Sequence, residues 1–221
     1  MKLQNILLAV LLAALICGCS KKDSAAQATD GADTEANAPE GKKYPFEKGI
    51  IHQETEMLGM KVPTVIYFDK WGDWEATETT MSMGKMMGEE LNAHTINIIK
   101  GDEVWEIDLI EKTGTYSKIT EPEDAPFSML DIRQFNDTSE FNIEELGTEE
   151  YLGYKCKKMK IKNKTGEEEI EVIAFVYGTM TMKIEGETMG MKVGMSITKI
   201  EKVAPPAEKF KVPEGIVITG E

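Results

Sequence analysis

Short runs in which apolar and polar side chains alternate recur along most of this chain. Between positions 60 and 68 the even-numbered residues are mostly apolar, whereas Lys61 on the opposite parity suits water. Trp105 and Ile107 alternate with Glu106 and Asp108 in the same way. Because successive side chains of a strand point to opposite faces, this pattern indicates strands with one buried and one wet face. It predicts a mainly β protein of about ten antiparallel strands.

The C-terminal half repeats the alternation with methionine on the apolar parity. Two runs show it, and their apolar positions are Met180, Met182 and Ile184 in the first and Met191, Val193, Met195 and Ile197 in the second. A turn near residues 186–190 separates the runs, so they are expected to be neighbours in the sheet. Two adjacent strands would then present methionine-rich faces to the same side.

The region between the two halves is less regular and predicts one or two short helices. Residues 124–135 form the better candidate, with a possible cap at Asp124 and apolar residues at imperfect helical spacing. A second short helix is expected over residues 140–146. The fold class is therefore mainly β with minor α.

The chain begins with a positively charged end at Lys2 and an uninterrupted apolar run from Ile6 to Ile16. This run is too short to cross a bilayer, which takes about 20 residues, and is typical of a secretory signal. It ends in Ile16, Cys17, Gly18 and Cys19, which resembles a bacterial lipobox. In that motif a small residue precedes a cysteine that becomes the acylated N-terminus. Cys19 fits this position, whereas Cys17 would follow Ile16 and does not.

These features divide the chain into three parts. Residues 1–18 are the expected lipoprotein signal peptide, and residues 19–43 are the lipidated Cys19 with a flexible tether free of aromatic residues. Residues 44–221 form a single β-rich domain. Cys19 is expected to carry an N-terminal acyl and diacylglyceryl modification, and no other cofactor is expected.

The expected location is the cell envelope, with the protein attached to the membrane through its lipid. Ser20, the residue after Cys19, is not the Asp associated with inner-membrane retention in enteric lipoproteins, so the periplasmic face of the outer membrane is favoured. The formal net charge of -14 excludes a non-specific nucleic-acid binder, which relies on Lys and Arg to neutralise phosphates.

No familiar catalytic motif is present, and no enzymatic activity is expected. The sequence lacks a serine nucleophile elbow, a phosphate-binding glycine-rich loop followed by Lys, and an HExxH helix. His52 and His94 lie far apart in sequence, and Arg133 is the only arginine. We therefore predict no catalytic residues.

Methionine is unusually frequent, at 14 of 221 residues. Three interpretations remain open. Methionine can simply fill gaps in a core, or its unbranched thioether chains can line a deformable cavity for apolar ligands. The third is Cu(I) binding, because thioethers are soft ligands. Residues at a suitable spacing for one ion are Met81, Met83, Met86 and Met87.

Two stretches carry a family resemblance: Gly153 to Lys158 (GYKCKK), which enters a strand, and the ending Phe210 to Gly215 (FKVPEG). Together with the lipobox, the tether and the long strands, they resemble uncharacterised envelope lipoproteins grouped with the lipoprotein-carrier superfamily of LolA and LolB. The resemblance implies an open antiparallel half-barrel with helices on its concave side, able to hold acyl chains.

The leading hypothesis is a lipid-anchored protein that binds a hydrophobic ligand, a lipid or acyl chain, as a carrier or sensor. The residues predicted to line the cavity are Met60, Phe68, Trp105, Met180, Met182, Met191 and Met195. The alternative is a structural or interaction lipoprotein that binds an envelope protein and no ligand. Cu(I) binding is a lesser alternative.

Overall fold

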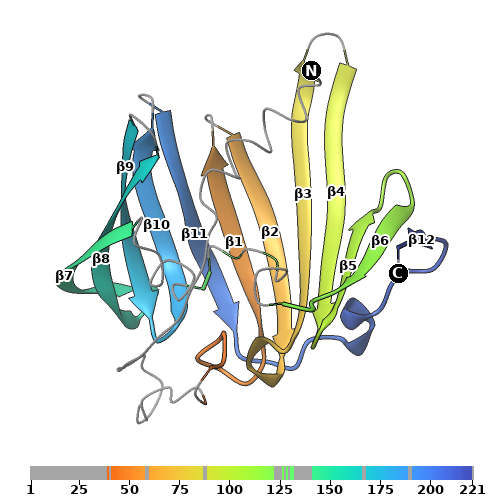
Figure 1. Ribbon diagram of the computed structural model, residues 1–221, viewed down its shortest axis with the longest axis horizontal. Helices are drawn as coiled ribbons and strands as arrows, with labels where there is room; N and C mark the ends of the chain where they lie inside the picture. Colours follow the sequence, from red (N-terminus) through yellow and green to blue (C-terminus); the bar gives the residue numbers. More distant parts are fainter. Residues whose placement is uncertain are drawn as a thin grey trace.

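Twelve strands form one open sheet in the computed structural model of this chain (Figure 1). The structure describes residues 39, 41–57, 60–86, 89–121, 126, 128, 130–131, 141–165, 168–188 and 191–220. The strand order is β12-β6-β5-β4-β3-β2-β1-β11-β10-β9-β8-β7, so the two end strands do not meet. This arrangement confirms the predicted open half-barrel, with two strands more than expected.

Two antiparallel meanders make up almost the whole sheet. The first consists of β1 (Gly49–Met57), β2 (Met60–Asp69), β3 (Trp74–Met86), β4 (Glu89–Lys100), β5 (Glu103–Asp108) and β6 (Thr113–Lys118). The second consists of β7 (Phe141–Tyr151), β8 (Tyr154–Thr165), β9 (Glu168–Tyr177), β10 (Met180–Thr188) and β11 (Met191–Glu201). They join where β1 pairs with β11, and the short β12 (Val217–Thr219) runs parallel to β6.

The alternation of apolar and polar residues in the sequence matches the alternation of buried and exposed side chains in the structure. In β2, the even positions Thr64, Ile66 and Phe68 are buried, whereas Lys61 and Pro63 are exposed. Cross-strand partners share a face, so the pairing extends this division across neighbouring strands. We call the face that carries Phe68, Met182 and Met195 the methionine face, and the other, which carries Tyr67 and Ile107, the tail face.

One prediction about helices is wrong and the other falls mostly outside the described residues. Residues 141–151 form the strand β7 and not a helix, because this stretch pairs along β8. Glu149 of β7 forms an ion pair of 2.7 Å with Lys158 of β8. The many acidic side chains of β7 therefore suit a strand that lies beside the lysine-rich β8. Of the helix expected over 124–135, the structure describes four non-helical residues: Pro126, Ser128, Leu130 and Asp131.

Helical structure in the described residues is limited to short 3-10 turns. These are η1 (Lys70–Gly72), between β2 and β3, and η3 (Ala207–Phe210), after β11. Within the same residues, no helix is long and apolar enough to cross a membrane.

Two apolar cores lie on opposite faces of the sheet. The first covers the methionine face of β1, β2 and β8–β11 and includes Phe68, Met182 and Met195. The second lies on the tail face of β3–β5, where Ile98 and Ile107 pack with Phe210 of η3. The chain after β11 covers the second core, with Val212, Ile216 and Ile218 packed against it.

Candidate functional site

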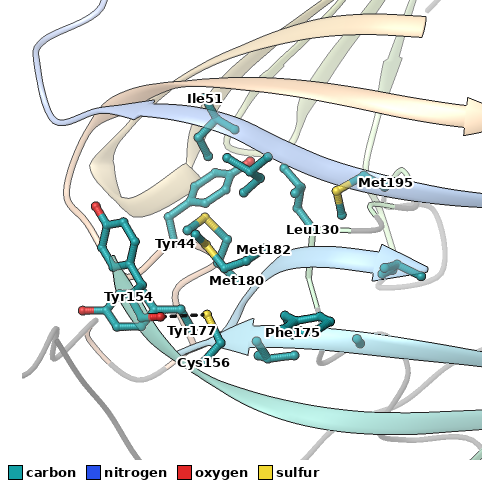
Figure 2. Close-up of a cluster of buried hydrophobic side chains, with 14 of the residues drawn as sticks. Tyr44, Ile51, Leu130, Tyr154, Cys156, Phe175, Tyr177, Met180, Met182 and Met195 are labelled. Carbon is teal, nitrogen blue, oxygen red and sulfur yellow. Dashed lines mark hydrogen bonds between the residues drawn. The ribbon is translucent and has the colours of Figure 1, made fainter. Parts of the chain in front are cut away.

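Four of the seven residues predicted to line a cavity lie together on the methionine face. Phe68, Met180 and Met182 have none of their surface exposed, and Met195 has 1% exposed. They belong to one buried cluster with Tyr44 and other apolar side chains, which Figure 2 shows in close-up. In this structure these methionines form a closed apolar core.

Of the other three predicted residues, Met60 and Trp105 are not members of this cluster. Met60 is half-buried on the methionine face, near the other end of β2. Trp105 packs on the tail face, with its ring 5.4 Å from that of Tyr116. Met191 begins β11, and its side chain lies outside the described residues. Alternation in the sequence shows which residues of one strand share a face. It does not show which face of that strand lies on the same side of the sheet as a given face of another strand.

A segment from outside the sheet covers part of the methionine face. Leu130 is buried, with 3% of its surface exposed, and it belongs to the cluster of Met180 and Met182 (Figure 2). Its carbonyl accepts a hydrogen bond of 2.8 Å from the backbone N–H of Thr181, and Asp131 makes an isolated bridge to Met180. We call residues 130–131 the cover segment.

Residues 41–48, which we call the strap, cover the end of the same core. Tyr44 is fully buried, and its ring centroid lies 4.1 Å from that of Phe68. The backbone N–H groups of Lys43 and Tyr44 both donate to the carbonyl of Trp71, each over 3.2 Å. Trp71 has a positive φ of 57°, an uncommon conformation for a bulky residue. The local backbone of η1 is thus shaped to receive the strap.

A buried carboxylate at Glu75 fixes the strap from the β3 side. It accepts hydrogen bonds of 2.7 Å from both the Lys43 ammonium and the Tyr44 hydroxyl. Burial of the Tyr44 phenol, reinforced by the nearby Glu75 carboxylate, raises the pKa of Tyr44 well above its usual range. Sequence reasoning placed the domain boundary at Tyr44 but missed its role in the core. The available signal was that Tyr44 is the first aromatic residue after the tether.

The thiol of Cys156 lies in the same core and is not paired. Burial raises its pKa to about 11, and its Sγ contacts the carbonyl of Tyr154 at 3.5 Å (Figure 2). A thiol of this kind is protonated near neutral pH and reacts slowly, because the thiolate is the nucleophile.

The two histidines lie apart, each with its own glutamate. His52 contacts Glu201 at 2.8 Å, and His94 contacts Glu78 at 2.9 Å. In the part of the chain that the structure describes, no three or more His, Cys, Asp or Glu side chains are grouped as a metal site. Of the four methionines considered for Cu(I), Met81 is half-buried on β3. Met87 and the side chains of Met83 and Met86 lie outside the described residues.

The tail face carries a separate open groove over β9–β11, β1 and β2. Its volume is about 660 Å³. Its charged lining includes Glu54, Glu56, Lys61, Lys183, Glu187 and Lys192. Several of these charges are already neutralised, since Lys61 pairs with Glu54 and Lys183 with Glu185.

Comparison with known proteins gives a family and a fold. Residues 48–176 match the family model described as "Domain of unknown function (DUF4412)". This match covers β1 to nearly the end of β9 and leaves β10–β12 outside. A search of curated proteins finds no match to this sequence.

Among solved structures, this chain is similar to an uncharacterized conserved protein from Thermus thermophilus. The TM-score is 0.50 at 9% sequence identity, covering 78% of this chain and 89% of that one. A complex of MucA and MucB from Pseudomonas aeruginosa gives a TM-score of 0.47 at 9% identity, covering 76% of this chain and 56% of that one. At such identity the first similarity concerns the fold alone.

Proposed function

The chain belongs to the DUF4412 family, and we propose that it is a non-catalytic, lipid-anchored envelope protein that holds an apolar ligand against its methionine face. The ligand is a lipid or acyl chain, and the role is that of a carrier or sensor. The lipid on Cys19 attaches the protein to the periplasmic face of the outer membrane. Incorporation of labelled palmitate, lost in Cys19→Ser, tests the anchor.

One observation carries the proposal for a ligand. The methionine core is closed by the strap and the cover segment, which are not part of a second sheet. The carbonyl of Leu130 accepts a hydrogen bond from Thr181 of β10, and Asp131 makes an isolated bridge to Met180. An acyl chain that displaced this segment would bury the same apolar surface, at about 25 cal/mol per Å².

Methionine suits the floor of such a site. Met180, Met182 and Met195 have flexible, unbranched side chains that can repack around ligands of different shape. A core of Leu and Ile would be more rigid. The methionines therefore favour exchange between the cover segment and a ligand over permanent closure.

The test is a reversible lock on the cover segment. Asp131→Cys with Met180→Cys places two cysteines at the bridged positions, where antiparallel partners lie close enough for a disulfide. The protein is the chain from Ser20 to Glu221, secreted under a cleavable signal, and the readout is uptake of the fluorescent probe N-phenyl-1-naphthylamine. The reduced variant should take up the probe and the oxidised variant should not.

A matched lock belongs on the other core. Thr113→Cys with Val217→Cys joins β6 to β12, which are paired at these positions. Probe uptake should be the same in both redox states of this control. Equal uptake by the oxidised and reduced forms of the cover lock would contradict the proposal.

A specific observation supports the alternative of a protein partner. The groove on the tail face is open to solvent and lined by charged side chains, so it suits a polar partner and not an acyl chain. If wild-type protein takes up no probe, this surface becomes the preferred binding site. Lys192→Glu would then be expected to weaken capture of an envelope partner.

A further inference from the structure

Uncharged polar side chains cross the methionine face next to the apolar core. In the strand register, Gln53 lies opposite Thr64, Thr64 opposite Thr79, and Thr79 opposite Thr95. We call these four residues the polar belt. On its other side Gln53 lies opposite Ile197, a fully buried member of the methionine core. One line across five strands thus changes from apolar to hydrogen-bonding.

Strand pairing places the belt on a single face, and one side-chain contact joins two of its members. The hydroxyls of Thr64 and Thr79 lie 3.2 Å apart, and the Gln53 amide donates to the Thr55 hydroxyl over 3.2 Å. The amide oxygen of Gln53 is buried and has no hydrogen-bond partner among the described residues. A buried acceptor without a donor is unfavourable, so a donor that reached this oxygen once the methionine face was uncovered would be stabilising.

The composition of the belt differs from that of the other face of the same strands. On the tail face, β1 carries Glu54, paired with Lys61, and β3 carries Glu78, paired with Lys209. The belt itself contains hydroxyls and an amide and no charge. Threonine favours strands in general, but that preference would not by itself place four uncharged polar residues in one line across four strands.

The belt offers both donors and acceptors but no cation. Each threonine hydroxyl can donate and accept, and the Gln53 oxygen can accept. The buried charge on this face of β3 is Glu75, which already binds Lys43 and Tyr44. An anionic headgroup would find no positive partner in the belt, whereas ester and hydroxyl groups would be matched.

We propose that the polar belt binds the ester and hydroxyl groups of a neutral acylglycerol whose acyl chain lies on the methionine core. This inference rests on the proposed function and adds the class of ligand. Adjacent strands are about 4.8 Å apart, so the step from Ile197 to Gln53 matches the step from the first chain carbons to a headgroup.

The test compares probes that share a chain length. The chain from Ser20 to Glu221 is loaded with N-phenyl-1-naphthylamine, which is then displaced by 1-monolauroylglycerol, laurate or dodecane. Wild-type protein should bind 1-monolauroylglycerol more tightly than laurate. Thr79→Val with Thr95→Val should weaken 1-monolauroylglycerol about tenfold and leave dodecane unchanged, because only hydrogen bonds are lost.

Thr80→Val is the matched control, since Thr80 is exposed on the same strand and points to the tail face. It should leave the displacement of all three probes unchanged. Equal binding of 1-monolauroylglycerol by wild type and the double variant would overturn the polar belt as a headgroup site while leaving the proposed function intact. An equal loss for dodecane would also overturn it. Failure of wild type to take up any probe would defeat the proposed function and this inference together.

Discussion

The two halves of the sheet bury opposite faces and are covered in different ways. Around β8–β11, β1 and β2, the methionine face is covered by the strap and the cover segment. Around β3–β6, the tail face is covered by the end of the chain, which pairs with β6 as β12. The cover of the tail face continues the sheet as β12, whereas the strap and the cover segment lie outside the twelve strands.

This difference assigns separate roles to the two cores. The cover on the tail face is fixed by strand pairing and by the ion pair between Lys209 and Glu78 at 2.7 Å. Leu130 has the Thr181 hydrogen bond and the adjoining bridge. The cover on the tail face is thus partly a strand of the sheet, whereas the ligand proposal concerns the methionine core, whose cover segment lies outside the twelve strands.

The chain carries a native reporter for each core. Trp74 and Trp105 pack against the tail-face core, whereas Trp71 receives the strap, so tryptophan fluorescence follows the tail-face half in a Trp71→Phe background. Cys156 lies in the methionine core, and its labelling by a thiol reagent follows the other half. The two signals show which of the two cores a mutation disturbs.

The largest effect is expected from Phe68→Ala in the methionine core. Phe68 is fully buried against Tyr44, and truncation of such a side chain costs about 3–5 kcal/mol. Urea unfolding should shift accordingly, and Cys156 should become labelled at lower urea than in wild type. A loss under about 1 kcal/mol would contradict the packed core described above.

A somewhat smaller effect is expected from Phe210→Ala, in the cover of the tail face. Its ring lies 5.9 Å from Trp74 and has 4% of its surface exposed, so about 3 kcal/mol should be lost. Tryptophan emission should shift to the red and amides of β12 should exchange faster, while Cys156 stays protected. Simultaneous loss of Cys156 protection would show that the two cores open together.

The attachment of the chain after β11 to the tail face should weaken in acid. Burial works to raise the pKa of Glu78, but hydrogen bonds from Lys209 and His94 outweigh it and lower that pKa below 4.5. Because the folded-state pKa is depressed, its contribution is present above pH 4.5 and is lost as the pH falls through the folded-state value.

Glu78→Gln tests this contribution, which is at most about 1 kcal/mol for a pair partly open to solvent. The acid-induced change in tryptophan emission should be smaller in the variant than in wild type. Glu54→Gln, which removes a charge paired with Lys61 away from the tail, is the matched control. An identical acid response in wild type and Glu78→Gln would count against the ion pair as an anchor.

The smallest effect is expected from Thr181→Val, beside the cover segment. The Thr181 hydroxyl is buried and has no hydrogen-bond partner among the described residues. Valine has nearly the same shape without the polar group, so stability should be unchanged or rise by up to about 1 kcal/mol. A loss above that amount in urea unfolding would mean that the hydroxyl binds a partner in solution.

The sequence predicted strands and turns well where the signal was local. Lys100 to Glu103 lies between two alternating runs, and Gly101 there adopts the positive φ of 68° that a hairpin turn favours. A helix was expected over 140–146, but residues 141–151 form an edge strand whose acidic side chains lie beside the lysines of β8. Pairing with β8 decided between helix and strand.

The buried positions were less accessible to sequence reasoning. Thr181 was expected on the polar parity, but the register shifts between Thr181 and Lys183, and Thr181 is fully buried beside Leu130. Trp105 was expected beside the methionines and lies on the other face. Both differences depend on contacts between residues far apart in the sequence.

Strands with one apolar face each could be predicted from the amino-acid sequence, because side-chain alternation is a local property of the backbone. Which face each half of the sheet buries is set by tertiary packing. That choice depends on where the strap, the cover segment and the chain after β11 pack, and these segments meet the sheet through long-range contacts. The same packing placed the polar belt next to the methionine core.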